Sequence, residues 1–331
     1  MQAILARFTA YFAPRRFAPA WDLGIAPPVA RSTPHVYVAL RGVSNLVWQG
    51  FGMDDLHLVD GKVPLVWWDQ TSNFGDLLSP WIVRKLSGHD VVLADRTRPH
   101  YLAIGSVLDK ANDQSIVWGS GSFGTESRSH MPRGAQYLAF RGPLTRNKID
   151  TAKLNAPRIY GDPALLVPMF HKREREPSHE LGVIVRWSEP RLRDGLNLEG
   201  VKKIDFSRGD IEAVLDDILD CKRILSSSLH GLIIADAYGI PNAWKVTNSP
   251  KGREFKFWDY FLSVGKLRDP CTFKLLQPNM SWHRIVEEVA FDGRPIVLDL
   301  QRLLAACPFN SMGLTLHKKP PTIAAPRLVS G

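Results

Sequence analysis

Short runs of β-branched and aromatic residues alternate along the chain with stretches that have apolar residues at helical spacing. Such runs are typical of buried strands, and the alternation predicts βα units on a largely parallel sheet, so the fold class is α/β. In the first half, strands are predicted at Val36–Leu40, Val63–Trp68, Val91–Leu93, Tyr101–Ile104, Ser115–Trp118 and Tyr137–Phe140, and a helix at Leu77–Leu86.

A polar segment in the middle of the chain separates these elements from a second series. Residues His171–Glu180 combine a charge run with a proline and follow neither periodicity, which is typical of a linker. Further strands are predicted at Gly182–Trp187, Val201–Phe206, Arg223–Ser226 and Asn242–Val246, and helices at Ile211–Leu219, Trp282–Ala290 and Ile296–Ala305. We therefore expect one domain at 1–175, with an extension at 1–34, and a second at 176–310. The last helices of the second domain are expected to pack back on the first domain, and residues 311–331 are expected to form a mobile tail.

Length and composition support a globular protein of two domains. The chain has 331 residues, of which 44% are hydrophobic and 23% charged. Its three cysteines are far apart and in no CxxC spacing, so neither a disulfide framework nor a thiolate metal site is predicted. No apolar run reaches the roughly 18 residues of a membrane span, and we expect a cytoplasmic location.

The net charge of +9 favours an anionic partner, which can be a phosphorylated substrate, an acidic membrane surface or nucleic acid. The basic residues are scattered and accompany no nucleic-acid-binding signature, so we expect no nucleic acid. The N-terminal segment MQAILARFTAYFAPRR combines an apolar helical face with arginines. It leaves open a peripheral contact with an anionic inner membrane, with a packed terminal helix as the simpler interpretation.

The segment SSSLHGLIIADAYGIP, Ser226–Pro241, predicts a strand end, a turn and an apolar helix closed by Gly239. In parallel α/β sheets, ligands bind beyond the carboxyl ends of strands, where helix N-termini offer free N–H groups to anions. Ser227, Ser228 and His230 are expected there. Helix capping by the serines and a hydrogen-bonded core role for the histidine are the alternatives, but the position favours acid–base chemistry at His230.

Three other motifs follow predicted strands. Gly119–Gly124 matches GxGxxG, but no helix opens at its third glycine, so we expect a glycine loop along a cleft and no dinucleotide site. Arg141 precedes a helix that begins with proline, where it can reach a ligand, and a salt-bridged surface arginine is the alternative. Asp162 lies in a sharp turn, where it can also cap. No HExxH, DxD or clustered Cys and His motif is present, so no metal is predicted.

In their order and spacing, these blocks resemble the polysaccharide pyruvyl transferase family, whose members put pyruvate ketals on bacterial exopolysaccharide sugars. Only SSLHG is specific by itself, and the resemblance spans Val63 to Gly265. The blocks are Asn73-Phe74-Gly75-Asp76, Gly119-Ser120-Gly121, Arg141-Gly142-Pro143-Leu144-Thr145, Gly161-Asp162-Pro163-Ala164, SSSLHGLIIADAYGIP and Phe255-Lys256-Phe257-Trp258-Asp259-Tyr260.

The resemblance implies a glycosyltransferase-B-like architecture, in which two Rossmann-like domains face one another across a cleft. It further implies phosphoenolpyruvate as the donor substrate, a lipid-linked oligosaccharide as the acceptor, no cofactor, and His230 as the general acid. The sequence departs from the family at Val185-Arg186-Trp187, where many relatives carry a Pro-His-Tyr-like segment after the strand.

This chemistry assigns roles to the remaining candidates, because an enol phosphate needs an acid for its methylene carbon and cations for its carboxylate and phosphate. Donor binding is predicted for Arg141, Arg186, Ser227, Ser228, Lys245 and Lys256. Asp76 is the candidate that orients or deprotonates the acceptor hydroxyls, with helix capping as its alternative. Acceptor contacts are predicted for Asn73, Asp162 and Trp187.

Two other functions stay open at this point. A glycosyltransferase that uses a nucleotide sugar would occupy the same cleft, and it would bind UDP or GDP instead of phosphoenolpyruvate. A non-catalytic saccharide-binding protein of polysaccharide assembly would keep the fold without turnover.

Overall fold

The computed structural model describes residues 56–149, 154, 156–172, 174–246, 254–310 and 313–314, all of them in the unit Gly50–Gly331. The predicted extension at 1–34, the predicted strand at Val36–Leu40 and nearly all of the predicted tail at 311–331 lie outside the described residues. In the described ranges, no helix has both the length and the apolar character needed to cross a membrane.

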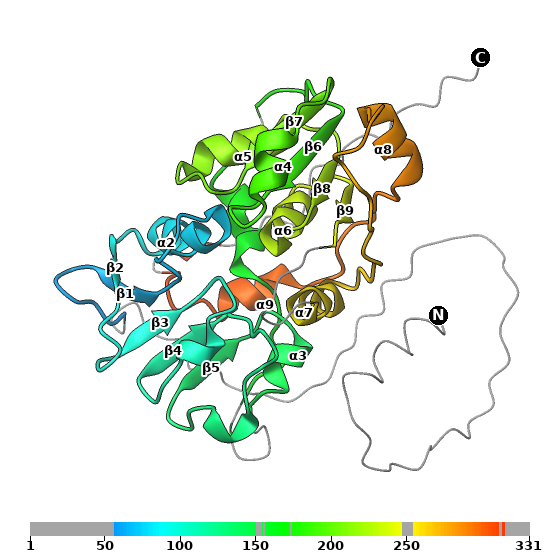
Figure 1. Ribbon diagram of the computed structural model, residues 1–331. Helices are drawn as coiled ribbons and strands as arrows, with labels where there is room; N and C mark the ends of the chain where they lie inside the picture. Colours follow the sequence, from blue (N-terminus) through cyan, green and yellow to red (C-terminus); the bar gives the residue numbers. More distant parts are fainter. Residues whose placement is uncertain are drawn as a thin grey trace, which may run out of the picture. The chain divides into compact units, whose positions relative to one another are not determined.

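Two parallel sheets organise the described chain (Figure 1). The five-stranded sheet has the order β2-β1-β3-β4-β5, and the four-stranded sheet has the order β7-β6-β8-β9. Their bounds are β1 Val63–Val66, β2 Val91–Leu93, β3 His100–Leu102, β4 Ser115–Trp118, β5 Gln136–Ala139, β6 Leu181–Val185, β7 Val201–Asp205, β8 Ile224–Ser226 and β9 Asn242–Trp244. The α/β class and the parallel pairing expected from the sequence are thereby confirmed. The domain boundaries remain predictions.

The strands are connected by helices and short 3₁₀ turns. The α-helices are α2 Phe74–Ser87, α3 Pro143–Arg146, α4 Pro190–Gly195, α5 Ile211–Leu219, α6 Leu229–Ala237, α7 Phe255–Val264, α8 Trp282–Glu288 and α9 Leu300–Ala305. The 3₁₀ turns are η1 Leu108–Lys110, η2 Arg128–His130 and η3 Pro163–Met169. Helix α9 begins four residues later than the predicted Ile296, because Asp299 caps it by accepting hydrogen bonds from the backbone of Gln301 and Arg302.

Helix α6 lies at the centre of the larger hydrophobic core. It packs against β8, β9, α2 and η3, and nearly all its residues are buried. A helix that is apolar on every side is stable only when it is surrounded, and the sequence LHGLIIADA has this character. The N-terminus of α6, which carries His230, is therefore held in a fixed place between the two sheets.

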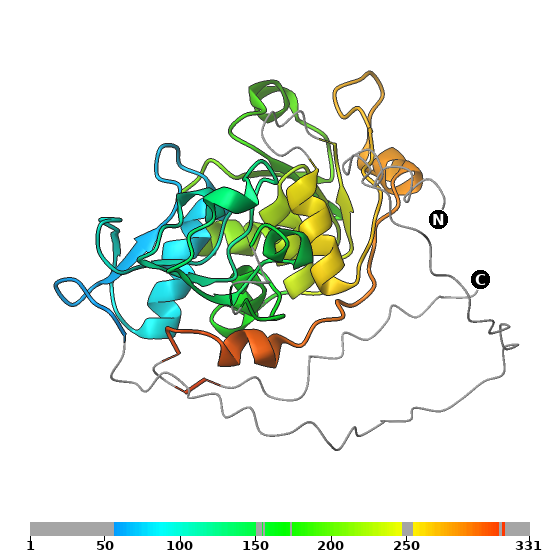
Figure 2. The same ribbon diagram turned by 90° about the horizontal axis from the view of Figure 1, so that it is seen from below.

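The end of the described chain returns to the first sheet, and α9 lies beside it in both views (Figures 1 and 2). The indole nitrogen of Trp118 donates to the carbonyl of Leu303 at 2.9 Å. Phe309 packs edge-on against Tyr101 and Trp118, with ring centroids 4.8 and 5.8 Å apart. Helix α8 instead contributes Ile285 to the core of the second sheet.

Candidate active site

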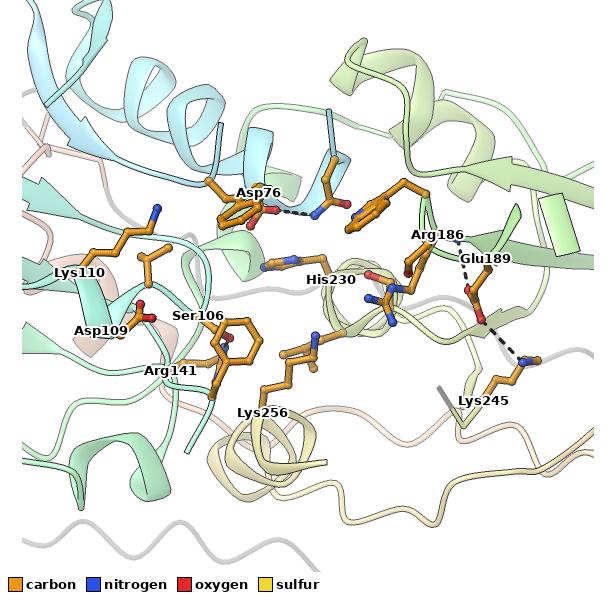
Figure 3. Close-up of a pocket in the computed structure, with 18 of the residues that line it drawn as sticks. Asp76, Ser106, Asp109, Lys110, Arg141, Arg186, Glu189, His230, Lys245 and Lys256 are labelled. Carbon is orange, nitrogen blue, oxygen red and sulfur yellow. Dashed lines mark hydrogen bonds and ion pairs between the residues drawn. The ribbon is translucent and has the colours of Figure 1, made fainter. Parts of the chain in front are cut away.

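A pocket of about 750 Å³ opens where the carboxyl ends of strands from both sheets meet the N-termini of α2, α6 and α7. Figure 3 shows Asp76, Arg141, Arg186, His230 and Lys256 around this space. Ligands of parallel α/β proteins bind at such strand ends. Nine of the eleven predicted site residues line the pocket: Asn73, Asp76, Arg141, Arg186, Trp187, Ser228, His230, Lys245 and Lys256. Ser227 and Asp162 do not.

His230 is the second residue of α6, two positions after the N-cap residue Ser228. It packs so tightly on α2 that a β-carbon at Gly75 would collide with its Nδ1, so this position requires glycine. Only 9% of the residue is exposed. Burial and the nearby cations Lys256 and Arg141 lower the pKa of His230 to about 3. In this arrangement the imidazole is neutral at physiological pH.

Asp162 lies behind His230 and not in the pocket. Its side chain is fully buried, and its Oδ2 lies 3.8 Å from Nε2 of His230. Its Oδ1 caps η3 by accepting a hydrogen bond from the backbone of Ala164 at 3.0 Å. Burial raises the pKa of Asp162 to about 6. Because Asp162 is fully buried and does not line the pocket, the structure does not bring it to the acceptor contact predicted from the sequence.

Arg141 forms a buried ion pair, which contradicts the alternative of a surface arginine. Its Nε donates to Oδ2 of Asp259 at 3.1 Å, and both side chains are fully buried. Its Nη1 and Nη2 donate to Ser106 Oγ and the carbonyl of Ser122, each at 2.8 Å. The guanidinium lies against the glycine loop, where a side chain at Gly121 would collide with it. Arg141 is thus a rigid cation at one wall of the pocket.

Asp259 connects this cation to α7. Its Oδ1 accepts from the backbone of Thr145 at 2.8 Å, and its Oδ2 accepts from the hydroxyl of Thr145 at 2.5 Å. Helix α7, which carries Lys256 as its second residue, is thereby fastened to α3.

Lys256 lies among other cations and is partly buried. Burial and the positive charges of Arg186 and Arg141 lower the pKa of Lys256 to about 7. Its Nζ lies 5.7 Å from the ring centroid of Phe123, within range of a cation–π contact. Burial also lowers the pKa of Arg186, while Glu189 and Asp76 act in the opposite direction. Neighbouring cations destabilise one another's charged forms. An anion placed between them therefore stabilises the charged form of each.

Glu189 is a site residue that sequence reasoning missed. Its Oε2 accepts from the hydroxyl of Ser227 at 2.5 Å, and its Oε1 lies 3.9 Å from Nζ of Lys245. Ser227 is therefore turned to this carboxylate and does not itself line the pocket, so the structure does not bring it to the donor contact predicted from the sequence. Lys245 lines the pocket with its charge partly satisfied. The sequence signal that could have revealed Glu189 was its position directly before Pro190, at the N-cap of α4.

Asp76 faces the cations from the first turn of α2. Its Oδ2 accepts from the side-chain amide of Asn73 at 2.6 Å, so the two predicted residues act together. The side chain of Asn73, the N-cap residue, makes no capping bond, and no described contact makes Asp76 a helix cap. Burial raises the pKa of Asp76, while Asn73, Lys256, Lys110 and Arg186 lower it.

Two half-exposed tryptophans stand at the pocket, one after a strand of each sheet. Trp187, predicted from the sequence, follows β6 and is 44% exposed. Trp68, which was missed, follows β1 and is 39% exposed, with Nζ of Lys110 5.3 Å from its ring centroid. Phe123 lines the pocket from the glycine loop that was expected along a cleft. Other lining residues lie in loops or a short 3₁₀ turn without a motif, and the sequence did not reveal them: Ser106, Val107, Asp109, Lys110, Ser188 and Val246.

Comparisons with known proteins find similarity over much of the chain. The family model described as "Polysaccharide pyruvyl transferase" matches residues 86–249, which include the segment around His230. The succinoglycan biosynthesis protein ExoV of Rhizobium meliloti (strain 1021) is 31% identical over 219 residues, which cover 61% of this chain and 65% of ExoV. The chain is similar to the polysaccharide pyruvyl transferases. This similarity confirms the resemblance predicted from the sequence and the predicted enzyme class, a transferase.

A viral protein and a protein of known structure are also similar to this chain. The uncharacterized protein L143 of Acanthamoeba polyphaga mimivirus is 28% identical over 232 residues, covering 63% of this chain and 77% of L143. The functionally uncharacterized protein KP1_0663 of Klebsiella pneumoniae covers 60% of this chain and 87% of its own, with 11% identity and a TM-score of 0.37. The chain thus spans just under two thirds of ExoV and about three quarters of L143.

Among the described residues, no three His, Cys, Asp or Glu side chains are grouped as a metal ion would require. The absence of a metal and of a cofactor remains a prediction.

Proposed function

We propose that this transferase moves the enolpyruvyl group of phosphoenolpyruvate onto a sugar of an exopolysaccharide intermediate, as a ketal. The observation that carries the proposal is the set of cations around His230, formed by the buried Arg141 and the partly buried Arg186 and Lys256. The cleft between two Rossmann-like halves, in a glycosyltransferase-B-like arrangement, would hold both substrates. A lipid-linked saccharide is the proposed acceptor, and the relative named for succinoglycan biosynthesis supports a saccharide.

The donor suits these cations because it carries a carboxylate and a phosphate close together. Arg141 is held by Asp259 and Ser106, so it costs little further ordering when an anion binds. Lys256 has its pKa lowered to about 7 and gains a full charge when an anion approaches. Ser228 adds the N-terminus of α6, where backbone N–H groups favour negative charge.

Binding of the donor would also prepare His230 for its role as general acid. With its pKa lowered to about 3, the histidine needs nearby negative charge before it can hold a proton at neutral pH. One unit charge at about 4 Å contributes about 4 kcal/mol at an effective dielectric constant of about 20, or about three pKa units. A donor with two anionic groups therefore supplies enough to bring the imidazole into the range of an acid near pH 7.

The acceptor would enter from the side of Asp76 and the tryptophans. Asp76, held by Asn73, is placed to orient a sugar hydroxyl by accepting its hydrogen bond. Trp68 and Trp187 offer flat apolar faces of the kind on which pyranose rings pack. Attack of two hydroxyls on C2 of the donor would give the ketal and release phosphate.

Calorimetric titration tests the proposed donor. Phosphoenolpyruvate is expected to bind, and UDP and GDP are not, with binding weakened at least tenfold in Lys256→Met and Arg186→Met. Lys203→Met is a matched control, because Lys203 is exposed on β7 and donates to the carbonyl of Arg193. Binding of UDP or GDP without phosphoenolpyruvate would instead indicate a nucleotide-sugar glycosyltransferase. Binding of saccharide alone, with no turnover, would indicate a protein of polysaccharide assembly.

A further inference from the structure

Two buried polar atoms without a hydrogen-bond partner face one another beneath the pocket. In the described part of the chain, four buried side-chain nitrogen and oxygen atoms have no partner, and two of them are Oδ2 of Asp162 and Nε2 of His230. The two atoms lie 3.8 Å apart. A closure of roughly 1 Å would give a hydrogen bond of ordinary length. Since buried polar groups are almost always paired, the natural partner of each atom is the other.

The fold fixes Asp162 in an orientation that leaves only this atom available. Its Oδ1 is used by the backbone of Ala164, at the start of η3. The turn before it is tied to the first sheet, because the backbone N–H of Gly161 donates to the carbonyl of Phe140 at 3.0 Å. Gly119 leaves room for the ring of Pro163, with which a β-carbon would collide. These contacts fix the backbone of the turn, and the carboxylate itself cannot turn without losing its hydrogen bond to Ala164.

His230 is held equally firmly from the other side. Helix α6 packs on η3, and the first turn of α2 brings Gly75 against Nδ1. Because Nε2 is buried and directed at Asp162, Nδ1 is the ring nitrogen that remains for a substrate in the pocket that His230 lines.

We propose that Asp162 is the positioning residue of His230, and that by binding Nε2 it decides whether Nδ1 meets the substrate as a hydrogen-bond donor or as an acceptor. An ionised Asp162 accepts from Nε2–H, which leaves a lone pair on Nδ1. A protonated Asp162 donates to Nε2, which places the hydrogen on Nδ1. One buried proton thus switches His230 between base and acid.

The charges around the pair favour this sharing of one proton. Burial raises the pKa of Asp162 to about 6, and burial with Lys256 and Arg141 lowers the pKa of His230 to about 3, so the first proton enters at the carboxylate. Other groups that face the pair are Asp259 and the Tyr260 hydroxyl of α7, and Asp76 of α2 and Arg186 after β6 line the same pocket.

This use of the pair rests on the proposed pyruvyl transfer, in which each bond and each proton can be followed. The π electrons of the donor form a C–H bond on the methylene carbon with the hydrogen of Nδ1, while the proton of Asp162 passes to Nε2. The first sugar hydroxyl forms a C–O bond at C2, its proton goes to Nδ1, and the proton on Nε2 returns to Asp162. Phosphate then leaves with the electrons of its C–O bond, the second hydroxyl adds to C2, and its proton leaves with the phosphate. The pair is restored after the first addition.

Nitrogen-15 NMR of histidine-labelled protein tests the pair without any substrate, with the His230 signals assigned by their loss in His230→Gln. At pH 8 we expect His230 to carry its hydrogen on Nε2. In Asp162→Asn the amide oxygen keeps the bond to Ala164, so the amide nitrogen faces Nε2 and the hydrogen is expected on Nδ1 at every pH. Hydrogen on Nδ1 in the unmodified protein at pH 8, or an unchanged tautomer in Asp162→Asn, would overturn the proposal.

Kinetics provide the second readout. Asp162→Asn should lower kcat about a hundredfold or more and remove one limb of its pH profile, while phosphoenolpyruvate affinity changes less than threefold. Asp299→Asn is the control, because Asp299 also caps a helix but faces no histidine in the described residues. An Asp162→Asn pH profile identical to that of the unmodified enzyme would contradict the positioning role. Should phosphoenolpyruvate not be the substrate, the NMR result still decides on the pair.

Discussion

Gly75 and His230 touch in a way that admits no side chain at residue 75, because a β-carbon there would collide with Nδ1 of the imidazole. Gly75 is the second residue of α2, where alanine would otherwise favour the helix. We expect Gly75→Ala to displace the histidine and lower kcat at least tenfold, with circular dichroism unchanged. Gly209→Ala is the control, since its nearest neighbours lie 3.7 Å from an added β-carbon. Full activity in Gly75→Ala would show that this contact does not position His230.

Donor binding should depend on pH through Lys256. Its pKa is lowered to about 7 by burial and neighbouring cations, so the ammonium is fully charged below that pH and loses its charge above it. The affinity for phosphoenolpyruvate should fall by up to about tenfold for each pH unit above 7, with uptake of a proton on binding. Calorimetry between pH 6 and 9, in buffers of different ionisation enthalpy, measures both quantities. Lys256→Met should abolish the dependence of phosphoenolpyruvate affinity on pH. If the affinity of this variant still fell with pH as in the unmodified protein, the dependence would belong to another group.

The buried pair of Arg141 and Asp259 should be far more important for stability than an exposed pair. Removing one partner leaves an uncompensated buried charge, so Arg141→Met and Asp259→Asn are each expected to lower the free energy of unfolding by about 3–5 kcal/mol. The double variant should lose much less than the sum of the two. Arg84 and Asp90 form an exposed pair at 3.3 Å, and Arg84→Ala should cost at most about 1 kcal/mol. Urea denaturation gives these values, and additive losses would argue against a direct coupling.

The two tryptophans should act on the acceptor and not on the donor. Loss of a stacking surface in Trp187→Ala or Trp68→Ala is expected to raise the KM for a saccharide acceptor about tenfold, with phosphoenolpyruvate affinity unchanged. Trp282→Ala is the matched control, because Trp282 lies on α8 and does not line the pocket. An equal effect of all three substitutions would indicate a general loss of folding.

Local patterns were sufficient to predict most of the sheet framework. The short β-branched runs marked β2 and β4 with their observed bounds, and the period of Ile211–Leu219 marked α5. The segment around His230 was placed correctly because a strand, a turn with small residues and an apolar helix have distinct local signals.

The partners of the site residues could not be read in the same way. Asp162 and His230 are 68 positions apart, and their contact depends on how η3 packs against α6. Ser227 was predicted at the donor because serines suit helix N-termini, but the carboxylate of Glu189, 38 residues earlier, takes its hydroxyl. Helix α7 was not predicted, although FKFWDYFLSV has polar residues at helical spacing, at Lys256, Asp259 and Ser263, which was a usable signal.

Pyruvyl transfer with protonation of the donor's methylene carbon can be followed by running the reaction in deuterium oxide. Phosphoenolpyruvate labelled with carbon-13 at its methylene carbon would be incubated with the protein and a panel of lipid-linked and free saccharides. The account predicts phosphate release that requires an acceptor, and a ketal whose methyl group carries a single deuterium, with both signals lost in His230→Gln. Phosphate release without a ketal, or no turnover with any acceptor, would contradict it.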